Sequence, residues 1–178
     1  MEKNVYYFDM DGVIANFHKE PYKYTNAINR EWIANLEPFM ENVQLIRSLI
    51  ARNENVYILS KAASEEAKIG KIDWLAKYIP ELTIEKIIVI VGNGKKVDYL
   101  ATETGILVDD DIKNTRPWMK AGHRAITLEF KGQTIQLWKI KCLISQALFV
   151  MRVSSNSIPD LWTNYEQKFK IMNEALLQ

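Results

Sequence analysis

The sequence has little that would tie it to an oxidising compartment, a membrane or a nucleic acid. Of its 178 residues only Cys142 is a cysteine, so no internal disulfide can form, as in reducing compartments. The hydrophobic runs are too short to span a membrane, and Glu2 and Lys3 do not fit a signal peptide. The net charge is +1 without a basic block, which disfavours a polynucleotide partner. We therefore expect a cytoplasmic protein that binds neither membranes nor polynucleotides.

Short apolar runs separated by helical patterns indicate an α/β fold. The composition, 48% hydrophobic and 25% charged, is that of a globular protein with one main core. The first four runs are apolar at nearly every residue, which is typical of parallel strands buried on both faces. The alternation predicts a Rossmann-like parallel sheet in the order 3-2-1-4-5, with helices on both faces. The predicted strands are Val5–Phe8, Val56–Leu59, Ile87–Val91, Ile106–Val108 and Ala125–Phe130.

The clearest helix signal lies between the second and third predicted strands. Ser64 precedes two glutamates, which is a helix start, and Pro80 ends the pattern. A second helical pattern covers Asn42–Arg52, and Val97, Leu100 and Ala101 give the face of a third helix. Strands and helices therefore alternate along most of the chain.

The connection between the first two strands is too long for one crossover helix. We predict that residues 17–38 form a small helical cap and that residues 1–16 and 39–132 form the core. Residues 133–178 are predicted to be a mainly helical extension packed on the core. Within it, 133–151 alternates like a strand but also fits a buried helix, and 157–176 is an amphipathic helix. The apolar face of that helix fits packing on the domain, with a homo-oligomer contact as the alternative.

Two carboxylates, Asp9 and Asp11, follow the first strand and stand only two residues apart. Like charges this close repel, so a cation or a shared proton should accompany them. Ser60 follows the second predicted strand and Asp109 follows the fourth. In the predicted strand order both flank Asp9, at the carboxyl end of the sheet where α/β proteins bind ligands.

This set of side chains fits phosphoryl transfer. Converging carboxylates hold a divalent cation, and hard oxygen ligands select Mg²⁺. Asp9 would attack phosphorus and form an aspartyl-phosphate, while Asp11 would protonate the leaving oxygen and then deprotonate water. Ser60 and a lysine would bind the phosphate oxygens. Gly12 would allow a tight turn and a close approach of backbone N–H groups to the phosphate.

Four motifs resemble, in order, those of the haloacid dehalogenase superfamily of phosphatases. They are DMDGV, the serine of YILSKA, the glycine-rich lysine segment and LVDDD, and the match spans about residues 5–130. Within the superfamily, DMDGVIANF, YILSKA, IDWLAKYIP, GKKVDYL and LVDDDIKNTRPWMKAGHRAITL look like the 5′(3′)-deoxyribonucleotidase family. This resemblance, rather than the spacing, implies a nucleoside monophosphate as the substrate.

The resemblance also implies a role for each motif residue. Asp9 would be the nucleophile and Asp11 the general acid and base. Asp9, the backbone carbonyl of Asp11 and Asp109 would be the Mg²⁺ ligands. Asp110 would lie behind them and orient the lysine or a metal-bound water.

The identity of the phosphate-site lysine is less direct. Lys95 and Lys96 are adjacent, and Lys96 precedes the acidic-aromatic pair that follows the family's lysine, so Lys96 is preferred. Phe17 lies nearest the catalytic loop and is the best candidate for contact with a nucleobase. The alternative is that Phe17 and the other aromatic residues of the cap, Tyr22, Tyr24 and Trp32, fill its core.

The sequence thus predicts a Mg²⁺-dependent enzyme that hydrolyses (deoxy)ribonucleoside 5′-monophosphates. One alternative is a phosphatase or phosphomutase for a sugar phosphate or another small phosphomonoester. Another is a binding protein that has kept the fold without the chemistry. His18 and His123 lack a second histidine or cysteine at ligand spacing, so structural or surface roles are expected for both.

Overall fold

The computed structural model describes residues 5–17, 28–129 and 131–135. By its internal contacts the chain divides into two compact units, residues 1–140 and 141–178, and the second lies outside the described residues. The helix predicted over 157–176 and all but the first three residues of the 133–151 segment also lie outside them. The boundaries predicted for the cap and the extension therefore stay predictions.

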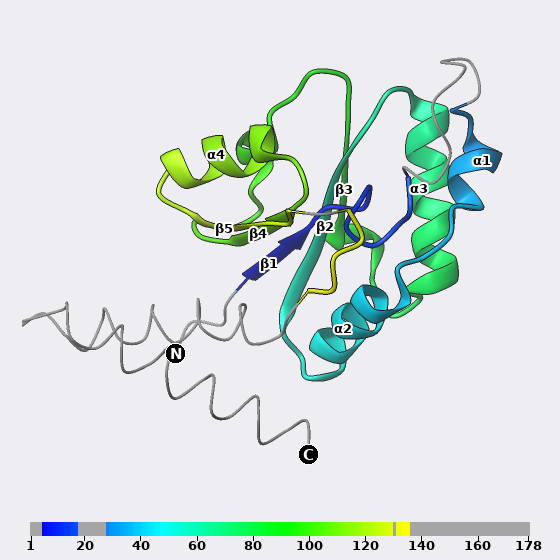
Figure 1. Cartoon of the computed structure of the whole chain (residues 1–178), viewed down its shortest axis with the longest axis horizontal. Helices are drawn as coiled ribbons and strands as arrows, with labels where there is room; N and C mark the ends of the chain where they lie inside the picture. The colour runs from blue at the N-terminus through cyan, green and yellow to red at the C-terminus, as the bar shows by residue number, and fades with distance from the viewer. Residues whose placement is uncertain (1–4, 18–27, 130, 136–178) are drawn as a thin grey trace, which may run out of the picture. The chain divides into compact units, whose positions relative to one another are not determined.

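The described chain is built on one five-stranded sheet (Figure 1). All strand pairs are parallel and the order is β3-β2-β1-β4-β5, which confirms the predicted Rossmann-like fold. In this order β1 lies between β2 and β4, so the ends of these three strands share one edge. The strands are β1 (Val5–Phe8), β2 (Asn55–Ala62), β3 (Ile87–Val91), β4 (Ile106–Asp109) and β5 (Arg124–Thr127).

Helices cover both faces of the sheet. Figure 1 shows α2 and α3 on one side and α4 on the other, as right-handed crossovers require when the chain reverses direction after β3. Ser64 caps α3 as predicted, because its side chain accepts a hydrogen bond from the N–H of Ala67. The helices are α1 (Arg30–Ala34), α2 (Met40–Ala51), α3 (Glu65–Tyr78) and α4 (Ile112–Lys120), with the 3₁₀ turns η2 (Ile84–Lys86) and η3 (Lys96–Tyr99).

Aromatic packing fixes the central strand. Tyr7 of β1 is fully buried, and its ring centroid lies 5.0 Å from that of Tyr57 and 5.3 Å from that of Trp118. Tyr6 and Phe8 point to the opposite face and are buried as well. Because β1 is packed on both faces, the residue that follows it, Asp9, starts from a rigid position.

Several local predictions differ from the structure, among them the end of β2, which runs on to Ala62 beyond the predicted Leu59. Among the described residues β3 is an edge strand, and only Ile90 in it is buried, because no described strand pairs with its outer side. The helix expected around Val97 is only the short η3 turn, which ends before Leu100. The last strand begins at Arg124 and stops at Thr127, shorter than the predicted 125–130.

The described part of the predicted cap contains α1, which packs on α3. Asn29 caps α1 by accepting a hydrogen bond from the N–H of Trp32. A Cβ at Gly70 of α3 would lie 2.6 Å from the carbonyl oxygen of Arg30, so the glycine allows the two helices to approach closely. Arg30 and Asp73 add an ion pair between these helices at 2.6 Å.

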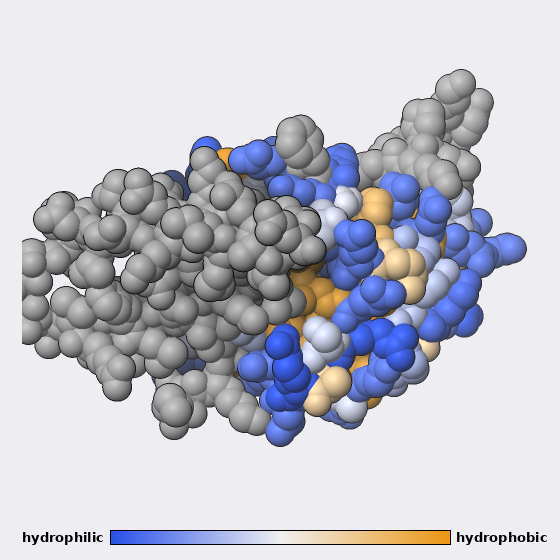
Figure 2. All heavy atoms as spheres, turned by 60° about the horizontal axis from the view of Figure 1, so that its bottom comes forward, coloured by the Kyte–Doolittle hydropathy of each residue, from blue (hydrophilic) through white to orange (hydrophobic). Residues whose placement is uncertain are grey.

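The surface around α2 is mostly hydrophilic in the described part, with a few hydrophobic groups among the polar ones (Figure 2). The exposed residues of α2 include Glu41, Gln44 and Arg47, whereas Val43 and Ile46 face the core. Among the described residues, no helix has the length and hydropathy to cross a membrane.

Candidate active site

The loop after β1 forms a compact turn around Met10. The backbone carbonyl of Met10 accepts hydrogen bonds from the N–H groups of Val13, Ile14 and Ala15, and the Met10 side chain is fully buried. Gly12 has a φ of +71°, a conformation that side chains other than glycine rarely adopt. Its N–H donates to the carbonyl of Ala15 at 2.9 Å. Gly12 therefore makes the predicted turn, but in this conformation its own N–H is not free for a phosphate oxygen.

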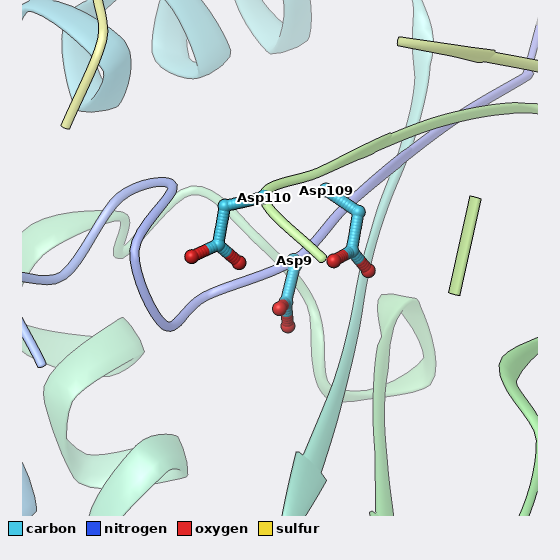
Figure 3. A group of neighbouring side chains, drawn as sticks. All are labelled: Asp9, Asp109 and Asp110. Carbon is cyan, nitrogen blue, oxygen red and sulfur yellow. The ribbon is translucent and has the colours of Figure 1, made fainter. Parts of the chain in front are cut away.

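Three carboxylates lie close together at the ends of β1 and β4. One ligand atom from each of Asp9, Asp109 and Asp110 can be chosen so that all lie within 4.8 Å of one another. Figure 3 shows their side chains gathered at this edge of the sheet. Asp9 and Asp109 are buried, whereas Asp110 is partly exposed. The strand order alone places Asp109 beside Asp9, as predicted.

Lys96 lies between two of these carboxylates. Its Nζ atom is 2.8 Å from Oδ1 of Asp9 and 2.6 Å from Oδ2 of Asp109, and its side chain is only 1% exposed. The lysine reaches them because η3 begins at this residue, just after the loop that follows β3. Lys95, the alternative, is exposed. The structure therefore brings Lys96 to the carboxylates and leaves Lys95 on the surface.

The start of α4 holds Asp109 in place. Oδ1 of Asp109 accepts hydrogen bonds from the N–H of Asp111 at 2.9 Å and from Nδ2 of Asn114 at 3.2 Å. Asp111 itself caps α4, because its side chain accepts from the N–H of Lys113. Both oxygens of the Asp109 carboxylate thus have partners, and its orientation is fixed by the backbone.

A second buried lysine, Lys71, was missed by the sequence reasoning. Its Nζ atom lies 2.6 Å from Oδ2 of Asp11 and donates to Oγ of Ser60 at 2.9 Å. Its side chain is 1% exposed and lies on the buried face of α3, together with Ala67, Gly70, Trp74 and Leu75. A lysine inside a helical pattern is ordinarily solvated, so only the helix period could have hinted that Lys71 shares the inner face with Ala67 and Trp74.

Of the two carboxylate oxygens of Asp11, one is paired with a described residue and the other is not. Oδ2 is paired with Lys71, whereas Oδ1 is buried and has no hydrogen-bond partner among the described residues. A buried carboxylate oxygen without a partner is costly, so this atom is suited to carry or receive a proton. The Asp11 side chain does not belong to the group formed by Asp9, Asp109 and Asp110.

The pKa values of Asp9 and Asp11 move in opposite directions. Burial alone would raise the pKa of Asp9, but the charges of Lys96 and Lys71 and hydrogen bonds from Lys96 and Ser60 outweigh it, so the pKa is lowered. Burial raises the pKa of Asp11, and the nearby charge of Asp9 adds to this against the opposing charge of Lys71. Two adjacent carboxyl groups with pKa values pushed apart are a common feature of acid and base pairs.

The pKa values of the two carboxyl groups that follow β4, Asp109 and Asp110, are both raised. Burial, followed by the charge of Asp9, raises the pKa of Asp109. Burial and the charges of Asp9 and Asp109 raise the pKa of Asp110 to about 7. Lys96 offsets only part of the negative charge of Asp9, Asp109 and Asp110. A bound cation would reduce the negative charge that remains.

Asp110 and Gly12 fit closely together. A Cβ added to Gly12 would lie 2.1 Å from Oδ2 of Asp110. The missing side chain of Gly12 therefore makes the space in which the Asp110 carboxylate lies. This close approach is a second reason for a glycine here, beyond the positive φ.

Residues 132–135 bind the loop that follows β1. The N–H of Gly132 donates to the carbonyl of Gly12 at 2.8 Å. Buried Asn42 of α2 donates to the carbonyls of Val13 and Gln133 and accepts from the N–H of Ile135 at 2.8 Å. The loop that carries Asp9 and Asp11 is therefore fixed by α2 and by residues 132–135.

A small cavity of about 240 Å³ lies beside Asp11 and Lys71. Phe17, predicted to contact a base, lines it, and the ring of Phe17 also packs edge-on against Trp32 with centroids 5.2 Å apart. Phe17 thus lines the cavity and also packs against α1, and its contact with a nucleobase stays a prediction. Tyr22, Tyr24 and His18 lie outside the described residues, and the ring of His123 packs against Trp118.

The residues present fit a divalent cation. The donor set consists of carboxylate oxygens, which hard cations such as Mg²⁺ prefer. Burial first, and then the charges of the neighbouring carboxylates, raise the pKa values of Asp109 and Asp110, and a cation would offset both causes. The structure groups the side chains of Asp9, Asp109 and Asp110, so Asp110 lies among the carboxylates that could hold an ion and not behind them as the resemblance implied. The Asp11 carbonyl named by the resemblance belongs to the same loop as Asp9.

Comparison with solved structures adds a likeness in fold. No family model matches the chain, and no curated protein matches it. The chain is similar to the crystal structure of class C acid phosphatase from Bacillus anthracis with tungstate bound, at 13% identity and a TM-score of 0.49. The likeness covers 89% of this chain and 82% of that one. A likeness at this level does not assign an activity to the chain.

Proposed function

We propose that the protein is a Mg²⁺-dependent phosphomonoesterase of the haloacid dehalogenase type. The observation that carries this proposal is the meeting of three carboxylates and two buried lysines at the carboxyl end of one parallel sheet. A cluster of negative charge flanked by fixed cations suits a phosphate ester, whose oxygens need positive partners and whose phosphorus needs an anionic nucleophile.

In the proposed reaction Asp9 is the nucleophile. Its lowered pKa keeps the carboxylate ionised, and β1 holds it rigidly. One of its oxygens forms a bond to phosphorus as the bond from phosphorus to the leaving oxygen breaks. The product of this step is an aspartyl-phosphate and a free alcohol.

Asp11 supplies and recovers the proton. Its raised pKa favours the protonated form, and Oδ1 is the oxygen that no described residue occupies. The proton passes to the leaving oxygen, which departs as an alcohol. The Asp11 carboxylate then takes a proton from a water molecule that attacks phosphorus, and phosphate and free Asp9 are released.

We propose that the hydroxyl of Ser60 and the ammonium groups of Lys71 and Lys96 bind the oxygens of the phosphate. Ser60 ends up between Asp9 and Lys71, and Lys96 contacts Asp9 directly. Each can turn a donor toward an oxygen of a phosphoryl group attached to Asp9. A divalent cation held by Asp9, Asp109 and Asp110 would neutralise negative charge that develops on the phosphoryl group.

For the substrate we propose a nucleoside 5′-monophosphate. The motifs that resemble the deoxyribonucleotidase family support it, and so does the cavity beside Asp11, which carries the aromatic ring of Phe17. An aromatic ring can stack on a flat base. A sugar phosphate or another small phosphomonoester remains the second candidate, because the described residues around the cavity include few groups that could read a base edge.

The test is phosphate release by the full chain with and without Mg²⁺. Deoxyribonucleotides, ribonucleotides and sugar phosphates are compared, and Asp9→Asn is the decisive variant. We expect Mg²⁺-dependent release that falls by at least about 10³-fold in Asp9→Asn with an unchanged circular dichroism spectrum. The matched control, Asp98→Asn, replaces an exposed aspartate and should keep full activity.

Each other outcome has a definite meaning. Full activity in Asp9→Asn would contradict the aspartyl-phosphate mechanism. Turnover of sugar phosphates alone would keep the mechanism and replace the substrate. No release from any ester would contradict the proposed function and favour a binding protein.

A further inference from the structure

Lys96 lies between two of the carboxylates that are proposed to hold the metal. Its Nζ atom is 2.8 Å from Oδ1 of Asp9 and 2.6 Å from Oδ2 of Asp109. Its side chain is 1% exposed, and its hydrogen bonds and ion pairs with described residues are made with these two carboxylates alone. A divalent cation that bound both carboxylates would therefore approach oxygens that the ammonium group already contacts.

The other oxygen of Asp109 is no alternative for a cation. Oδ1 accepts hydrogen bonds from the N–H of Asp111 at 2.9 Å and from Nδ2 of Asn114 at 3.2 Å. These two donors use both lone pairs of Oδ1, so a cation has to bind Oδ2, the oxygen that Lys96 contacts. Two cations on one buried oxygen repel each other strongly, because little water screens their charges.

Lys96 also has a reason not to leave Asp109. A buried ammonium group that loses an acceptor is destabilised, because neither water nor another described side chain replaces that acceptor. A phosphate group beside Asp9 changes this balance, since its oxygens accept charge-assisted hydrogen bonds from an ammonium group. The ammonium group of Lys96 then keeps a partner while Oδ2 of Asp109 becomes available to a metal ion.

We infer that Lys96 competes with a divalent cation for Asp109, and that a phosphate group relieves this competition by binding the ammonium group. The inference rests on the proposed function, because it takes Asp9, Asp109 and Asp110 as metal ligands and places the phosphate beside Asp9. The protein thus binds the metal weakly by itself and tightly together with a phosphate group. By linkage, metal and phosphate increase each other's affinity by the same factor.

The experiment measures the Kd of the full chain for Mg²⁺ by titration calorimetry, without phosphate and with saturating inorganic phosphate. In the wild type we expect phosphate to lower this Kd at least about tenfold. In Lys96→Met we expect Mg²⁺ without phosphate to bind at least about fivefold more tightly than in the wild type. Phosphate should also improve Mg²⁺ binding less in this variant, and the improvement that remains measures the direct attraction between metal and phosphate.

Two control variants separate competition for Asp109 from a general change of charge. Lys71→Met also removes a buried ammonium group, but one that contacts Asp11 and Ser60. Without phosphate, the gain in Mg²⁺ affinity should be at least about threefold larger in Lys96→Met than in Lys71→Met. Lys95→Met removes the exposed neighbouring lysine and should bind Mg²⁺ as the wild type does.

A crystal structure of the wild type with Mg²⁺ and phosphate tests the inference without any variant, in case Lys96→Met does not fold. We expect Nζ of Lys96 to lie on a phosphate oxygen, beyond hydrogen-bond distance of Oδ2 of Asp109. An ammonium group that stays on Oδ2 beside a bound Mg²⁺ ion would overturn the inference. So would a gain in Mg²⁺ affinity that is no larger in Lys96→Met than in Lys71→Met.

Failure of this inference differs from failure of the proposed function. If the wild type releases phosphate with Mg²⁺ but binds Mg²⁺ equally with and without inorganic phosphate, the competition at Asp109 is refuted and the proposed function stands. If the wild type releases no phosphate from any ester and binds no Mg²⁺ in the presence of phosphate, the proposed function fails and this inference fails with it.

Discussion

Lys71 and Asp11 form a buried ion pair that joins the helix after β2 to the loop after β1. The Nζ atom of Lys71 lies 2.6 Å from Oδ2 of Asp11 and also donates to Ser60. One ammonium group thus fixes the proposed acid and a proposed phosphate ligand relative to each other. Lys96 does the same for Asp9 and Asp109 on the other side of β1.

Replacing Lys71 should impair catalysis. In Lys71→Met the side chain keeps similar bulk, but Asp11 and Ser60 lose their shared donor. We expect kcat to fall by about 10²-fold, as for the loss of one donor at a transition-state charge. Steady-state kinetics on the best phosphate ester would measure it, with Lys68→Met on the same helix as the control. A kcat within threefold of wild type would show that Lys71 is not part of the machinery.

Replacing Lys96 should instead be a stability defect that metal partly repairs. Lys96→Met leaves the buried carboxylates of Asp9 and Asp109 without their cation, and loss of one partner of a buried pair costs about 3–5 kcal/mol. Chemical denaturation in EDTA would measure the loss of unfolding free energy. Added Mg²⁺ should stabilise the variant more than the wild type, since it supplies the missing positive charge. Equal stabilisation of both would contradict a metal site at these carboxylates.

Gly12→Ala should weaken both the fold and the metal site. The new Cβ would meet Oδ2 of Asp110 at 2.1 Å, in a backbone conformation with φ of +71° that alanine avoids. We expect a loss of about 1–3 kcal/mol in unfolding free energy and a weaker Mg²⁺ affinity, measured by denaturation and by titration calorimetry. Gly122→Ala is the comparison, because Gly122 also has a positive φ of 89° but open space around its Cβ position. If both variants bind Mg²⁺ alike, the close approach of Asp110 to Gly12 is unimportant for the metal.

The stability of the metal-free protein should depend on the ionisation of Asp110. Its pKa is raised from the ordinary 3.8 to about 7, chiefly by burial and by the charges of Asp9 and Asp109. The folded state therefore keeps a proton that the unfolded state releases, and stability falls as pH rises from about 4 to about 7. Urea denaturation at pH 5 and pH 8 in EDTA should show a smaller pH effect in Asp110→Asn than in the wild type. An identical pH effect in the two proteins would place the titration elsewhere.

Asn42 of α2 should matter for the loop that carries Asp9 and Asp11, because it bonds to the backbone of that loop at Val13. Its amide satisfies the carbonyls of Val13 and Gln133 and the N–H of Ile135, so Asn42→Ala leaves buried polar groups without partners. Each such group costs about 1–3 kcal/mol, and we expect a loss of at least about 2 kcal/mol in unfolding free energy. Gln44→Ala, at an exposed position of the same helix, should cost less than ~0.5 kcal/mol. An equal loss of unfolding free energy in Asn42→Ala and Gln44→Ala would show that the hydrogen bonds of Asn42 do not hold the loop.

Much of the fold could be predicted because strand and helix signals are local. The apolar runs marked β1 and β3 to the residue, and Ser64 marked the start of α3. The same local signals misjudged β2, which carries Lys61 and Ala62 past the predicted end, because pairing with β3 extends the strand where no apolar pattern does. They also overestimated the helix after β3, where only η3 forms.

The sequence by itself determined which chemistry-bearing residues end the strands, because a parallel sheet places all carboxyl ends of its strands at one edge. Asp9, Ser60 and Asp109 could therefore be grouped before any coordinates were known. Tertiary structure alone decided how their charges are balanced. Lys71 reaches Asp11 from the inner face of α3, and Lys96, which the family resemblance had already favoured over Lys95, contacts both Asp9 and Asp109. Such pairings depend on side-chain direction and helix packing across the fold, which no local pattern in the chain specifies.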